Sequence, residues 1–158
     1  MAELDNFDRL TKVLERLEAE SKAKNHVTVQ VGFTQRYAIL VHEDLEANHP
    51  VGQAKYLEQP AREMQNALKV QIIDAVNKGR SLREALIMAG MHLQRASQEL
   101  APVDTSALRA SAFTAVEEEA DRAAQEAFNK SEQIRLNSQA KRKVDKYRKS
   151  VKQRRKKS

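Results

Sequence analysis

The densest group of potentially reactive side chains is a short acidic segment that contains two histidines. Five potential metal ligands lie within eight positions, namely His42, Glu43, Asp44, Glu46 and His49. Two imidazoles with carboxylates can hold zinc or manganese. However, the spacing matches no closed-site pattern, and polar loops are often rich in these residues. We therefore interpret the group as structural or solvated and expect no bound metal, with a site at His42 and His49 as the open alternative.

Nucleophilic and phosphate-transfer chemistry have no support in the sequence. Thr105, Ser106 and Ser111 lie near Asp104, but no histidine is close to them and there is no Gly-x-Ser-x-Gly elbow. The four glycines are scattered singly, so no glycine-rich loop can cradle a phosphate, and the absence of cysteine excludes thiol nucleophiles and disulfides. Asp104 and Thr105 are better explained as helix caps. We predict a protein that is not an enzyme and that has no cofactor.

Length and composition limit the size of the core. The 158 residues fit one globular unit, but 22 of the apolar residues are alanine and tryptophan is absent, so the core should be aliphatic and thin. No stretch approaches the roughly 18 consecutive apolar residues that a membrane span needs, and the acidic start is unlike a signal peptide. We expect no membrane segment.

Charge is distributed unevenly along the chain. Residues 130–158 contain 13 basic and two acidic residues, a net charge of +11, whereas residues 1–129 have a net charge of −5. The last 29 residues also hold too few large apolar side chains to form their own core. The sequence therefore predicts an acidic body over residues 1–129 and a basic C-terminal extension over residues 130–158.

The basic extension is the strongest electrostatic feature. Its candidate contacts with DNA or a protein partner are Lys141, Arg142, Lys143, Lys146, Tyr147, Arg148, Lys149, Lys152, Arg154, Arg155, Lys156 and Lys157. Such residues can neutralise phosphates without reading a sequence. Val144, Tyr147 and Val151 recur at steps of three and four, which gives a helical tail a narrow apolar stripe for docking on protein. We favour docking on a protein surface and keep non-specific DNA contact as the second interpretation.

Apolar periodicity outlines the remaining elements. Intervals of three and four predict an amphipathic helix over residues 3–23, and alternation predicts a half-buried strand over residues 26–33. The apolar run 37–43 is too short to be assigned as a strand or a helical turn. Residues 110–116 are expected to form a second strand. Glycine and proline are absent from Glu117 onward, which predicts a helix that runs into the basic extension.

Two central helices have clear signals at their ends. One apolar stripe covers residues 61–76 and ends at Gly79, a good left-handed C-terminal cap. Ser81 and Glu84 have capping-box spacing at the start of a second stripe, which Pro102 closes. The short connection predicts that the two helices are antiparallel neighbours.

The start of the first central helix is indicated by a proline. Pro60 disfavours helix at residue 59 and suits a helix start at residue 60. Together, these patterns predict an α+β fold, in which a small antiparallel sheet packs on an antiparallel helix pair plus an N-terminal helix, with a basic helical C-terminal extension.

Three segments carry a family resemblance, at residues 37–43 (YAILVHE), 49–61 (HPVGQAKYLEQPA) and 101–111 (APVDTSALRAS). They resemble the tail-completion and head–tail joining proteins of tailed bacteriophages, whose motifs are a Tyr-Ala-x-x-Val-[His/Glu]-x patch, a (Phe/Tyr)-Leu-x-x-Pro-Ala helix start and a Pro-x-Asp-Thr-Gly-x-Leu-Arg-x-Ser turn. The matching residues are Tyr37, Ala38, His42, Glu43, Tyr56, Leu57, Pro60, Ala61, Pro102, Asp104, Thr105, Leu108, Arg109 and Ser111.

The resemblance covers roughly residues 27–116 and departs from the family in two respects. Ser106 stands where the family's turn has glycine, and the turn follows the Tyr-Ala patch here, whereas it precedes that patch in the commonest members. The resemblance implies a virion structural protein of the neck, a tail-terminator or tail-completion subunit that forms rings, hexamers or dodecamers, with portal, connector and tail-tube proteins as further partners. The alternative from the residues alone is a small nucleic-acid-associated protein that binds phosphates through its basic tail.

Overall fold

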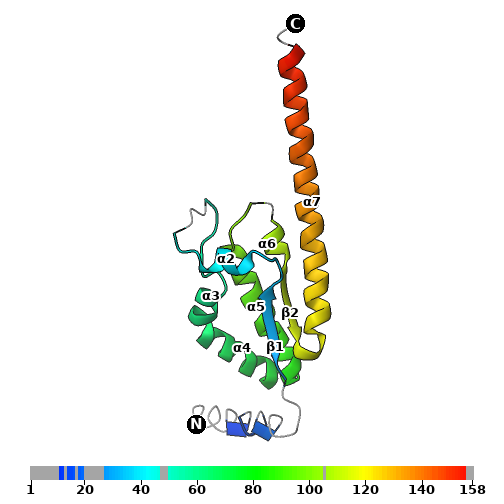
Figure 1. Cartoon of the computed structure of the whole chain (residues 1–158). Helices are drawn as coiled ribbons and strands as arrows, with labels where there is room; N and C mark the ends of the chain where they lie inside the picture. The colour runs from blue at the N-terminus through cyan, green and yellow to red at the C-terminus, as the bar shows by residue number, and fades with distance from the viewer. Residues whose placement is uncertain are drawn as a thin grey trace.

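The fold is known from a computed structural model that describes residues 11–12, 14–16, 18–19, 27–46, 50–104 and 106–155, with the backbone alone at residues 151 and 153–155. Its elements are, in chain order, β1 (Val29–Phe33), α2 (Ala38–Glu43), α3 (Glu58–Glu63), α4 (Gln65–Asn77), α5 (Leu82–Leu100), α6 (Ala107–Ala110), β2 (Ala112–Val116) and α7 (Glu117–Arg155). The molecule is mostly helical with one small antiparallel sheet, which confirms the predicted α+β class (Figure 1).

The two predicted strands form the sheet of the described residues. β1 pairs with β2 in antiparallel register, from Val29 opposite Val116 to Phe33 opposite Ala112. Side chains alternate between the two faces of a strand, so Val29 and Val31 point to the same face of β1. Both strands are shorter than predicted, because β1 begins at residue 29 and residues 107–110 form α6.

A glycine lets α5 lie directly on this sheet. A Cβ atom at Gly90 would lie 2.7 Å from Cγ2 of Thr114 and 3.1 Å from Cγ1 of Val29. The buried helix residues nearest in sequence are also small, with Ala85 fully buried and Ala89 6% exposed. Helix α5 and the sheet therefore approach more closely than they could with larger residues at the contact.

Helices α4 and α5 form the predicted antiparallel pair. Gly79 has a φ of 86°, and the N–H groups of Gly79 and Arg80 donate to the carbonyls of Val76 and Ala75 at the end of α4. The capping box of Ser81 is present in full at the start of α5. Ala75, Val76 and Ala85 then pack in one buried cluster beside the connection, as expected for antiparallel neighbours.

Three details differ from the sequence-based expectations. The apolar run that could not be assigned is a helix, α2. Helix α3 begins at Glu58, so Gln59 is helical; Pro60 sits in the first turn, where its missing N–H has no intrahelical acceptor to lose. The stripe expected to form one helix is divided at Met64, whose backbone (φ −87°, ψ 0°) separates α3 from α4.

The N-terminal prediction is described only in part. The described residues between 11 and 19 are helical, within the helix predicted over residues 3–23. The rest of that segment lies outside the described residues. Among the helices of the described chain, none combines the length and apolar character that crossing a membrane requires.

Helix α7 is continuous through the body and the basic extension. It follows β2 directly, begins with three glutamates and packs on β2 and α6. The boundary expected between residues 129 and 130 falls inside this helix. Ser131 is completely buried, whereas every residue from Gln139 to Lys149 is exposed. The last part of α7 therefore projects well beyond the body (Figure 1).

Candidate functional site

All three motif segments converge in one small core around Tyr56. Tyr56 is 1% exposed and packs with buried Ala38, Ala101 and Leu108. Partly buried Phe33, Tyr37, Val41, Leu57 and Leu100 surround this cluster. Residues as far apart in sequence as Ala38 and Ala101 thus share one hydrophobic core, which we call the motif core.

The Tyr56 ring is fixed by polar and aromatic contacts. Its hydroxyl donates to the carbonyl oxygen of Ala38 over 2.9 Å, and its ring meets Phe33 and His42 edge-on at centroid distances of 4.9 and 5.0 Å. Burial raises the pKa of Tyr56 to about 12. The phenol is therefore neutral at physiological pH and has a structural role.

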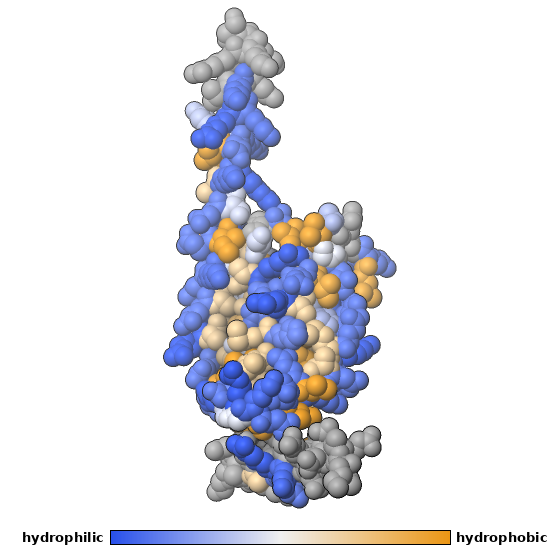
Figure 2. Space-filling view, turned by 180° about the vertical axis from the view of Figure 1, so that it is seen from behind, coloured by the Kyte–Doolittle hydropathy of each residue, from blue (hydrophilic) through white to orange (hydrophobic). Residues whose placement is uncertain are grey.

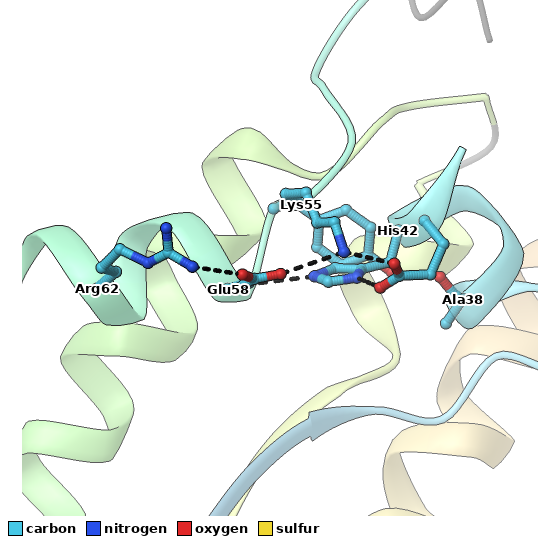
Figure 3. Close-up of polar contacts among 7 residues, drawn as sticks. Ala38, His42, Lys55, Glu58 and Arg62 are labelled. Carbon is cyan, nitrogen blue, oxygen red and sulfur yellow. Dashed lines mark hydrogen bonds and ion pairs between the residues drawn. The ribbon is translucent and has the colours of Figure 1, made fainter. Parts of the chain in front are cut away.

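A row of charged side chains crosses the surface next to the motif core (Figure 3). Lys55 Nζ bridges the carboxylates of Glu43 and Glu58, and Arg62 Nη2 lies 2.7 Å from Glu58 Oε1. The hydrogen bond from Lys55 and the contact with His42 hold the pKa of Glu43 below its ordinary value. The row links α2 to the start of α3.

Both ring nitrogens of His42 are engaged within the chain. Nδ1 lies 2.6 Å from Oε1 of Glu43, and Nε2 accepts a hydrogen bond from the backbone N–H of Glu58 over 3.4 Å. A neutral imidazole with its proton on Nδ1 satisfies both contacts. His49 lies outside the described residues, and the described part of the chain contains no group of three or more potential metal ligands.

The second motif segment pairs with the third through backbone contacts. The N–H of Gln53 donates to the carbonyl of Leu100, and the N–H of Val103 donates to that of Val51. Gly52 has a φ of 91°, and a Cβ atom there would lie 2.5 Å from the nitrogen of Pro102. This contact needs glycine both for its left-handed backbone and for the close approach. Pro60 of the same segment is buried and Ala61 is half-buried.

Arg109 of the third motif segment holds the end of α5. Its guanidinium donates to the carbonyls of Ala101 (3.0 Å) and Glu99 (2.9 Å), which lack helical partners at the C-terminal end. Buried Ser111 donates to the carbonyl of Leu108 over 2.7 Å. The motif arginine and serine therefore have structural roles in the turn.

The turn of the third motif segment has a left-handed backbone at its serine. Ser106 has φ 64° and ψ 1°. Next to it, Asp104 Oδ1 lies 2.6 Å from Nη2 of Arg142 in α7. Thr105 lies outside the described residues. Asp104 thus joins the turn to the base of the projecting helix.

Sequence reasoning missed the contact that fastens α7 to the body. The Nε2 group of buried Gln35 donates to Ser131 Oγ over 2.7 Å and to Glu132 Oε1 over 3.1 Å. Arg135 also binds Glu132, with Nη2 2.6 Å from Oε2. The hydrogen bonds from Arg135 and Gln35 hold the pKa of Glu132 below its ordinary value. No local pattern links residues 96 positions apart, so this contact could not be predicted from periodicity or spacing.

The basic candidate residues form a solvent-exposed stretch of helix. Within residues 141–149 every side chain is exposed, including Val144 (49%) and Tyr147 (70%). Lys152 is exposed as well. Of the remaining candidates, Arg154 and Arg155 have only their helical backbone described, and Lys156 and Lys157 lie outside the described residues. Residues 143–149 therefore present exposed side chains to a partner beyond the body.

Comparisons of the chain with protein-family models, with curated proteins and with solved structures found no match.

Proposed function

We propose that the protein is a non-enzymatic structural subunit of a bacteriophage virion, located in the neck between head and tail. Within the neck, we assign it to a tail-terminator, or tail-completion, ring. The proposal begins from the resemblance of the motif segments to proteins of that class. It is supported by what the motif residues do here, since Tyr56, Arg109 and Ser111 all make structural contacts.

The observation that carries the proposal is the contrast between a small core and large exposed apolar side chains. Of the 13 buried hydrophobic residues in the described part of the chain, nine are alanine, whereas Ile39, Leu40 and Leu45 are 76%, 72% and 74% exposed. Exposed apolar groups in this density are typical of surfaces that become buried in an assembly. A ring subunit gains stability in this way, because neighbouring copies cover what the isolated chain leaves open.

Native mass spectrometry of the purified full chain over a concentration series tests the ring. The expected result is a closed oligomer, a hexamer or a dodecamer. Labelling intact virions with an antibody to the chain then tests the location, which should be the head–tail joint. A protein that occurs as a lone copy without rotational symmetry, or that is absent from virions, would refute the proposal.

The second candidate function is nucleic-acid binding, favoured by the exposure of the whole basic stretch 141–149. Removing residues 143–158 separates the two functions, because this truncation preserves the Gln35–Ser131 contact and the Arg142–Asp104 ion pair. Loss of assembly assigns the extension to protein contacts. Intact assembly with loss of salt-dependent DNA binding assigns it to phosphates.

A further inference from the structure

The outer face of α2 is a mixed apolar and acidic surface. Glu43 follows Leu40 by three positions and Ile39 by four, so these three exposed residues share one side of α2, and exposed Leu45 lies two residues beyond it. Asp44 and Glu46 add two more carboxylates to the same short segment. We call residues 39–46 the α2 patch. The space-filling view shows separate hydrophobic groups at the end of the body from which α7 projects, where α2 lies (Figures 1 and 2).

A small cavity adjoins the α2 patch. It has a volume of about 170 Å³ and lies between Ile39, Glu43 and the ring of Tyr56. Its remaining lining consists of Phe33, Ala38, His42 and Leu57. An incoming apolar side chain can therefore meet a recess as well as an exposed face.

One exposed side of α7 carries a complementary surface that runs from the body into the projecting part. Leu136, Ala140, Val144 and Tyr147 are spaced by four, four and three residues, which aligns them on one side of the helix, and all four are exposed. Basic residues flank this stripe, among them Lys143. Two such stripes cannot pair with each other favourably, because their basic edges would repel.

The part of this stripe beyond residue 142 does not reach the α2 patch of the same molecule. The Gln35–Ser131 contact and the Arg142–Asp104 ion pair hold α7 against the body up to residue 142. Beyond that point the helix continues straight and away from the body (Figure 1). A contact between the two surfaces therefore requires two copies of the chain.

We propose that the exposed stripe of α7 in one copy docks on the α2 patch of a second copy. Val144 and Tyr147 cover Ile39, Leu40 and Leu45, and the lysines that flank the stripe face the acidic residues of the patch. This contact joins different surfaces of the two copies, so repetition gives a ring if the rotation closes and a filament if it does not. This inference rests on the proposed function only in requiring that copies of the chain assemble. It adds which two surfaces meet.

Cysteine crosslinking of the full chain tests this contact without background, because the natural sequence has no cysteine. Leu40→Cys and Val144→Cys variants with different affinity tags are mixed and mildly oxidised. The matched control replaces Leu40→Cys with Val70→Cys, since Val70 is 66% exposed on α4, away from the α2 patch. The proposal predicts a disulfide-linked heterodimer for the first pair and none above random collision for the control.

Charge reversal provides a second readout on the same crosslink. Changing Lys143, Lys146 and Lys149 to Glu in the Val144→Cys chain should abolish the heterodimer, and raising the salt concentration should weaken it. Adding Glu46→Lys to the Leu40→Cys chain should restore part of the heterodimer with the reversed tail, and Glu43 is left unchanged because it pairs with Lys55. Restoration excludes misfolding as the cause of the loss.

Three results would overturn the contact: equal yields with the Val70 control, a predominance of Val144–Val144 homodimers, and absence of any heterodimer. Absence of the heterodimer together with tail-dependent DNA binding would assign the basic residues 141–149 to phosphate binding. The same experiments decide the proposed function and the proposed contact independently of each other. A specific heterodimer from a protein absent from virions removes the phage role and keeps the contact, whereas a virion ring without the crosslink does the reverse.

Discussion

The phenol of Tyr56 donates a hydrogen bond to the carbonyl of Ala38, and this one bond ties α2 to the loop that leads into α3. Both residues belong to motif segments, and both are buried in the same cluster with Ala101 and Leu108 of the third segment. The motifs are therefore contact points of one packing arrangement.

Replacing Tyr56 with Phe should lower the free energy of unfolding by about 1 kcal/mol, because it removes one buried hydrogen bond and leaves the ring in place. Chemical denaturation measures the effect. Tyr147→Phe is the matched control, since Tyr147 is 70% exposed on the projecting helix and its change should leave the midpoint unmoved. Equal midpoints for all three proteins would show that the bond to Ala38 contributes nothing.

Alkaline pH should destabilise the fold through the same residue. The pKa of Tyr56 is raised from 10.0 to about 12 in the folded state, so folding favours the neutral phenol. Its contribution is complete below pH 10 and is lost as the pH rises toward 12. Thermal unfolding followed across this range should show a steeper decline for the natural protein than for Tyr56→Phe. If the stability of both proteins declines equally with pH, the raised pKa of Tyr56 is contradicted.

Local patterns predicted the elements whose signals lie within a few residues. The capping box of Ser81, the terminal Gly79 and the alternation in β1 all act locally, and the structure confirms each of them. Long-range packing could not be predicted in this way. The bond between Gln35 and Ser131 joins residues that share no periodic pattern, and tertiary contacts alone decide that Ile39 is exposed while Ala38 is buried.

Ser106→Gly should stabilise the protein by about 0.5–1 kcal/mol, because glycine adopts the left-handed backbone without the steric cost that serine has there. The gain is smaller than that cost, since glycine also raises the conformational entropy of the unfolded chain. The backbone at Ser106, with φ 64°, is the reason for the expected gain. Ser138→Gly is the opposite control: it places glycine inside α7 and should destabilise. Denaturation midpoints decide the sign, and a loss at Ser106 would contradict the strain.

Gly90→Ala should destabilise the protein, although alanine is the better helix former. Helix propensity alone favours the change by about 1 kcal/mol, but the added Cβ would meet Thr114 at 2.7 Å and Val29 at 3.1 Å. Overpacking of this kind costs about 1–3 kcal/mol, so the net effect should be a lower melting temperature. The double variant Gly90→Ala with Thr114→Ser removes the methyl group at the nearest contact and should recover part of the loss. A higher melting temperature for Gly90→Ala alone would mean that α5 lies further from the sheet.

Acid should loosen α7 from the body through Glu132. Hydrogen bonds from Arg135 and Gln35 place the folded pKa of Glu132 below its ordinary value of 4.5. A lowered folded pKa means that the carboxylate stabilises the fold above pH 4.5 and that this contribution is lost as the pH falls through the folded value. The hydrogen-exchange protection of residues 128–138, measured relative to the intrinsic rate of each amide at the same pH, should therefore fall below that pH in the natural protein, since the contacts of Glu132 then weaken.

Glu132→Gln, which carries no charge at any pH, should show lower protection at neutral pH and a flatter dependence on acid. Glu126→Gln is the matched control on the same helix, because the side chain of Glu126 is 75% exposed and lies 4.0 Å from Arg122. If Glu132→Gln and Glu126→Gln respond to acid alike, Glu132 does not fasten α7, and the buried bond between Gln35 and Ser131 must hold the helix without it.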